Sequence, residues 1–118
     1  MLDKNKQIPA VFYRTDKGIE PVRKWLLQQN VADRKIIGGD LKDVEYGWPV
    51  GMPLCRALGS GLWEVRSDIS NGRISRVIFC IWQEQMVLLH SFIKKTQKTP
   101  DADLKLALKR RKEVEKNG

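Results

Sequence analysis

The stretch LWEVRSDISNGRISRVIFCIWQEQMVLLHSFI, residues 62–93, alternates apolar and polar side chains and is interrupted only by short turn sequences. Its β-branched and aromatic residues fall into three segments that favour strands: residues 62–69, 73–82 and 85–93. Ser70-Asn71-Gly72 and Gln83-Glu84 separate these segments and are typical of tight hairpins. The stretch therefore predicts three consecutive antiparallel strands in one sheet.

The flanking sequence predicts one more strand and three helices. Residues 9–14 have strand composition, and residues 19–29 and 31–46 carry apolar residues at helical spacing. Residues 47–61 hold four glycines and two prolines and are expected to form a surface loop. Thr99 and Pro100 suit the start of a closing helix. We expect an α+β fold, in which an antiparallel-rich four-stranded sheet has two N-terminal helices on one face, followed by a C-terminal helix.

Composition is that of one folded, basic domain. With 118 residues, 42% of them hydrophobic and 31% charged, the whole chain 1–118 is predicted to form a single domain. Its formal net charge of +8 favours a polyanionic partner. No apolar run reaches the roughly 18 residues of a membrane span, and the N-terminus lacks the apolar core of a signal peptide. We therefore expect a cytoplasmic protein without a membrane partner.

The two cysteines do not indicate a metal site or a disulfide framework. Cys55 and Cys80 are far apart, without a CxxC spacing or a companion pair of histidines. Buried free thiols are the expected state. We predict no metal and no cofactor.

Strand alternation predicts where polar side chains gather. Because residues two apart in a strand point the same way, one face of the sheet is expected to carry Glu64, Arg66, Arg76, His90 and Lys94. Helices are expected to cover the other face, leaving these residues in an open cationic cleft, and Leu88 is expected on the same side as His90 and Phe92. Arginine and lysine there would bind RNA phosphates, and Phe92 would stack on an unpaired base.

Each of these residues also has a purely structural alternative. Arg76 in an apolar run needs a partner, and Glu64 on the neighbouring strand is the candidate. His90 is the only histidine and would then be a hydrogen-bonded structural residue. Phe92 would pack in the core, and Lys94, Lys95 and Lys98 would form a solvated charge run. The position of these lysines, directly before a helix whose first turn favours anions, argues for binding.

The order and spacing of LWEVR, RISRVIFCIW and VLLHSFIKKTQKTP, followed by a closing helix, resemble the RelE/ParE superfamily of bacterial type II toxins. The sequence is most similar to the phage-associated HigB-like branch, from about Val11 to Glu113. The resemblance implies a small RelE-like fold and a ribosome-dependent endoribonuclease that cleaves mRNA. It also implies an antitoxin, commonly a helix-turn-helix protein, through which DNA is contacted only indirectly. In such enzymes the 2′-hydroxyl attacks the adjacent phosphate without a metal.

The resemblance assigns roles to individual residues. Arg76 in SRVIF matches the strand arginine that contacts the scissile phosphate, and Arg66 and Lys94 line the same cleft. His90 and Glu64 are the candidates for proton transfer. The closing helix lacks the tyrosine that takes the acid or base role in some relatives, so lysines with lowered pKa values in a crowded cationic site are the alternative. The remaining predicted RNA-binding residues are Lys95, Lys98, Arg73 and Phe92. Two other functions stay open: a non-catalytic ParE-like inhibitor of DNA gyrase, and a phage-derived nucleic-acid-binding protein.

Overall fold

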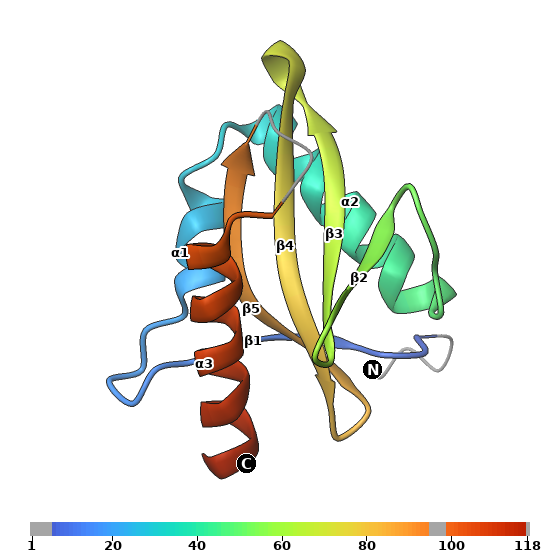
Figure 1. Cartoon of the computed structure of the whole chain (residues 1–118). Coiled ribbons are helices and arrows are strands. Elements are labelled where there is room, and N and C mark those ends of the chain that lie inside the picture. Colours follow the sequence, from blue (N-terminus) through green and yellow to red (C-terminus); the bar gives the residue numbers. More distant parts are fainter. Residues whose placement is uncertain (1–5, 95–98, 118) are drawn as a thin grey trace.

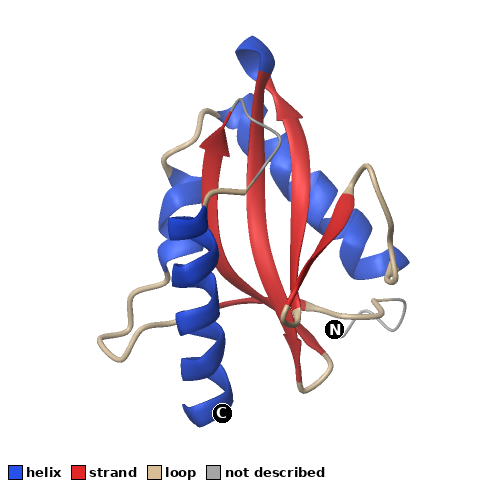
Figure 2. Ribbon diagram, in the orientation of Figure 1, coloured by secondary structure: helices blue, strands red, loops and turns tan. Residues whose placement is uncertain are grey.

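The computed structural model describes residues 6–94 and 99–117, which form a five-stranded mixed sheet with three helices (Figure 2). The strands are β1 (Ala10–Phe12), β2 (Cys55–Gly59), β3 (Leu62–Ile69), β4 (Arg73–Trp82) and β5 (Gln85–Lys94). The helices are α1 (Pro21–Leu27), α2 (Val31–Gly47) and α3 (Asp101–Asn117), with a 3₁₀ turn at Ser70–Gly72. The strand order is β1-β5-β4-β3-β2, with β1 parallel to β5 and the other neighbouring pairs antiparallel.

Helices cover both faces of the sheet. Helices α1 and α2 pack on one face and α3 lies across the other, as Figure 1 shows from the α3 side. The core on the first face includes Val22, Ile37, Val65 and Phe79. The core on the second face includes Ile78, Leu89 and Ala107. The two N-terminal helices share one face as predicted, but the opposite face is not left open.

The prediction of four strands is wrong, because residues 55–59 of the expected loop form β2. Gly59, Ser60 and Gly61 all have positive φ, at 86°, 53° and 75°. This left-handed backbone reverses the chain tightly, so Cys55 pairs with Val65 and Gly59 with Leu62. Two of the four glycines that indicated a loop, Gly59 and Gly61, therefore lie at the turn of a hairpin.

A β-bulge in β5 changes the predicted side-chain alternation. Ile78 pairs with His90 but the next residue, Phe79, pairs with Leu88, so Leu89 is the extra residue. Leu88 therefore packs in the core on the α1 and α2 side, whereas Leu89 packs in the core on the α3 side. The expectation that Leu88 shares a side with His90 and Phe92 is wrong for this reason.

The first turn of α2 is fastened to the hairpin between β3 and β4 by the buried carboxylate of Asp33. One carboxylate oxygen accepts the backbone N–H of Ser70 at 3.0 Å, and the other accepts the Ser70 hydroxyl at 2.9 Å. Arg73 donates to the same carboxylate at 2.8 Å. Arg73, which was expected to bind RNA, is thus held at the hairpin end of the sheet. The Ser70 N–H, then its hydroxyl and the Arg73 guanidinium, lower the pKa of Asp33 against the opposing effect of burial.

We predict that replacing Asp33 by Asn destabilises the fold at neutral pH. Because the pKa of Asp33 is lowered in the folded state, its contribution is complete above the unfolded value of about 3.9 and is lost as the pH falls through the folded value. Urea unfolding at a series of pH values should show that the free energies of unfolding of the wild type and Asp33→Asn become more similar in acid. The exposed Asp43 of α2 provides the control, Asp43→Asn, which should change little. A difference in free energy of unfolding that does not vary with pH would contradict the stabilising role of the ionised Asp33 carboxylate.

Candidate functional site

Cross-strand pairing places most of the predicted site residues in two adjacent rows on the α3 side of the sheet. The first row runs across β2, β3, β4 and β5 and consists of Arg56, Glu64, Ile78 and His90. The second row runs across β3, β4 and β5 and consists of Arg66, Arg76 and Phe92. Arg56 was not predicted, although it alternates correctly within β2 to join this face.

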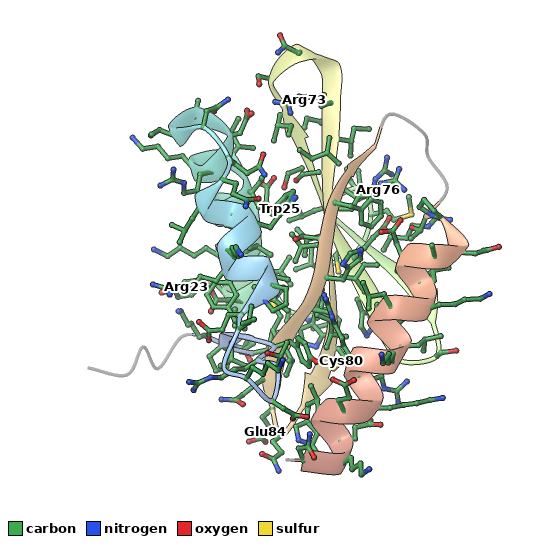
Figure 3. The ribbon with its side chains drawn as sticks, turned by 90° about the vertical axis from the view of Figure 1, so that its left-hand side faces the viewer. Arg23, Trp25, Arg73, Arg76, Cys80 and Glu84 are labelled. Atoms are coloured by element: carbon green, nitrogen blue, oxygen red, sulfur yellow. The ribbon has the colours of Figure 1, made fainter. Side chains whose placement is uncertain are left out.

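The centre of the two rows is buried. Arg76 and Glu64 are both 0% exposed. Thr99, just before α3, donates its hydroxyl to Glu64 at 2.8 Å and is itself buried. Figure 3 shows Arg76 on the side of the sheet that faces α3, opposite Trp25. The predicted open cleft is therefore closed over Arg76, and the buried Thr99 packs onto this part of the sheet.

Like charges surround Arg76. Burial lowers its pKa most, the negative charge of Glu64 acts in the opposite direction, and Arg66 and Arg56 lower it further. Like charges directly opposite one another, as Arg66 and Arg76 are, destabilise a sheet. Among the described residues, three guanidinium groups thus act on one another around the Glu64 carboxylate. A cluster of arginines favours binding of an anion.

Arg56 and Arg66 are the half-buried members of this arginine group, so they remain accessible from solvent. Arg66 also borders a depression of about 400 Å³ at the β3 edge, together with Asp40 and Asp68. These two carboxylates reduce the positive potential on that side of Arg66. An anion is therefore favoured between Arg56 and Arg66, over the buried Arg76.

His90 is held by a partner that the sequence did not point to. Its Nε2 atom lies 2.5 Å from Oδ1 of Asp103, in the first turn of α3. Its ring stacks on Phe92, with centroids 5.6 Å apart and planes at 25°. Phe92 also packs against the core on the α3 side, so it is not a free platform for a base. In the sequence, Asp103 was visible only as an acidic residue that suits a helix N-terminus.

The predicted lysines are only partly covered by the structure. Lys94 ends β5, and its backbone pairs with Ile74 of β4, two residues beyond the pair of Arg76 and Phe92 in the second row. Lys95 and Lys98 lie outside the described residues. Their expected contact with RNA stays a prediction.

A tyrosine does lie beside the closing helix, although none is within it. The Tyr13 hydroxyl hydrogen-bonds Glu113, and the Arg110 guanidinium lies 5.3 Å from the centre of the Tyr13 ring. Burial and the adjacent Glu113 raise the pKa of Tyr13 to about 12. Tyr13 therefore stays protonated at neutral pH and is unsuited to act as a base.

Both cysteines are buried free thiols, as predicted. Burial raises the pKa of Cys55 and of Cys80 to about 11, so neither is a nucleophile at neutral pH. Within residues 6–94 and 99–117, no group of three or more His, Cys, Asp or Glu side chains is close enough together to hold a metal ion. In the same part of the chain, no helix combines the length and apolarity that a bilayer crossing requires.

Comparison with known sequences identifies one family. The model of the family described as "Phage derived protein Gp49-like (DUF891)" matches residues 24–112, which include every strand except β1 and every residue of the two rows. Among curated proteins, none matches the chain.

We predict that Arg76 and Glu64 stabilise the fold as a pair. Arg76→Leu leaves the Glu64 carboxylate buried without the charge of Arg76, which costs about 3–5 kcal/mol for a buried pair. Glu64→Leu should be similarly destabilising, and the double variant should lose much less than the sum of the two single losses. Urea unfolding measures the free energy of unfolding of the wild type, the two single variants and the double variant.

The exposed Arg23 of α1 offers the matched control, Arg23→Leu, which should shift the midpoint little. A stable Arg76→Leu protein would show that the guanidinium is not needed to compensate Glu64. The same result would make Arg76 variants suitable for activity tests.

Proposed function

Since the chain belongs to the Gp49-like family of phage-derived proteins, we propose that it is the toxin of a type II toxin–antitoxin system. The toxin is of the RelE type and its HigB-like branch, and it acts in the cytoplasm as an endoribonuclease. It cleaves mRNA on the ribosome and thereby inhibits translation.

The observation that supports this activity best is the arginine group on the α3 side of the sheet, next to His90. Arg56 and Arg66 bind the scissile phosphate through their accessible guanidinium groups, which form bidentate contacts with phosphate oxygens. Arg76 adds positive potential from beneath without touching the RNA. This preorganised charge stabilises the extra negative charge that phosphorus acquires in the transition state.

The reaction needs only RNA and protein groups. The 2′-hydroxyl loses its proton to His90 and attacks the adjacent phosphate, which yields a cyclic phosphate and a free 5′-hydroxyl. Glu64, fully buried and bonded to Thr99, serves to hold Arg76 rather than to transfer a proton. In this respect the proposal departs from the role that the sequence suggested for Glu64.

The charge of the chain suggests an RNA partner, and the family resemblance suggests an antitoxin. Lys94, Lys95 and Lys98 bind message or ribosomal RNA, and the chain's net charge of +8 favours association with a polyanion. A cognate antitoxin of the helix-turn-helix type neutralises the toxin, and DNA is contacted only through that antitoxin.

The complete burial of Arg76 favours a second candidate. A non-catalytic protein, such as a ParE-like inhibitor of DNA gyrase or a nucleic-acid-binding protein of phage origin, needs a binding surface and no cleavage residues. In that case the pair of Arg76 and Glu64 has a structural role only.

We expect brief induction of the protein in bacteria to stop growth and to produce new mRNA 5′ ends inside translated codons. Arg66→Gln removes an accessible phosphate contact and should reduce cleavage by at least about tenfold, since one lost charge-stabilising contact can cost 10²–10³ in rate. Sequencing of transcript 5′ ends measures the effect.

Arg23→Gln removes the same charge from the opposite, α1 side and should leave cleavage unchanged. Growth arrest with a DNA-damage response and no new transcript ends would instead support the inhibitor of gyrase. Equal cleavage by Arg66→Gln and the wild type would exclude Arg66 from the site.

A further inference from the structure

The contact between His90 and Asp103 joins the end of the sheet to the first turn of α3. The two side chains are 15% and 22% exposed, so the contact lies at the edge of the covered region. His90 and Arg76 occupy diagonal positions in the two rows, which in a sheet are roughly 7–8 Å apart. Arg66, which contacts the phosphate in the proposed site, lies two strands from His90, roughly 10 Å across the sheet. An extended arginine side chain and the bound nucleotide together span this distance.

Chemistry determines which ring nitrogen carries the hydrogen. An ionised carboxylate only accepts hydrogen bonds, so Nε2 must be the donor to Asp103. Nδ1 has no hydrogen-bond partner among the described residues, and it is not one of the enclosed polar atoms without a partner. Among the described residues, Nδ1 therefore carries no hydrogen bond and is not fully enclosed. Stacking on Phe92 limits rotation of the ring.

We infer that Asp103 is a positioning residue that keeps Nδ1 of His90 free to accept the proton of the RNA 2′-hydroxyl. This inference rests on the proposed ribonuclease function. Asp103 does not touch the RNA. It selects the tautomer, orients the ring and stabilises the imidazolium that forms, as a carboxylate does for histidine in other enzymes.

The proton and the electron pairs balance in this step. The O–H bond of the 2′-hydroxyl breaks as the Nδ1–H bond forms, and the freed oxygen pair attacks phosphorus. The bond from phosphorus to the 5′-oxygen breaks as the bond to the 2′-oxygen forms. The leaving 5′-oxygen takes the proton from the imidazolium, directly or through water, and His90 returns to its neutral state.

The chain offers a sharp spectroscopic test, because His90 is its only histidine. In the ¹⁵N-labelled protein, at a pH where the imidazole is neutral, ¹⁵N shifts report which nitrogen bears hydrogen. The wild type should show hydrogen on Nε2. In Asp103→Asn the side chain can present either its oxygen or its NH₂ group to Nε2, so the share of the tautomer with hydrogen on Nδ1 should rise. The same variant should lose about 10²–10⁴-fold in RNA cleavage on ribosomes, the usual contribution of a positioned base.

Asp101→Asn is the matched control, because Asp101 is an exposed acid in the same helical turn. It should change neither the tautomer nor the rate. His90→Gln should lose as much activity as Asp103→Asn, and the double variant should lose no more. Thermal unfolding of each variant checks that the fold survives.

The outcomes separate the two proposals. If Asp103→Asn cleaves RNA as fast as the wild type, the positioning role is refuted, whichever ring nitrogen bears the hydrogen. If the wild type cleaves no RNA, the proposed function fails and the catalytic role of the dyad fails with it, while the ¹⁵N shifts still show whether Asp103 selects the tautomer.

Discussion

The burial of one guanidinium group constrains the α3 side of the molecule. Arg76 lies in the middle of β4 with 0% exposure, and a buried charge is tolerated only beside an opposite charge. Glu64 on β3 provides that charge, and the hydroxyl of Thr99 in turn bonds Glu64. Because Thr99 lies two residues before the first residue of α3, this chain of contacts holds the start of the last helix close to the sheet. The electrostatic demand of one residue thus contributes to the way the second face of the sheet is covered.

Helix α3 contributes residues both to the core and to the candidate site. Ala107 is buried against the sheet, and Leu104 and Leu108 pack beside it, which anchors the helix on the apolar part of the face. One turn earlier, Asp103 reaches His90. The β-bulge at Leu89 is what makes this contact possible, since it sets Leu88 on one face and His90 on the other. The β-bulge therefore determines that the His90 ring faces α3.

The two faces of the sheet have different roles. On the α1 and α2 side, the polar contacts around Asp33 fasten a helix to a hairpin, and Arg73 is used there. On the α3 side, Arg56, Arg66 and Arg76 gather positive charge at the boundary between buried and exposed surface. Arg73 thus serves stability on one face, whereas on the other face Arg76 is buried and Arg56 and Arg66 are half-buried.

The sequence by itself determined the bounds of β3 and β4 and the grouping of Glu64, Arg66 and Arg76 on one face, because alternation with a period of two and turn residues are local properties. Only the tertiary structure decided that residues 55–59 form a strand, that Arg76 is sealed, that Arg73 binds Asp33, and that Asp103 meets His90. Each of these depends on where a distant segment packs. Such contacts join residues that are far apart in the chain and come together only when the chain folds. Side-chain periodicity is a local property and therefore carries no information about them.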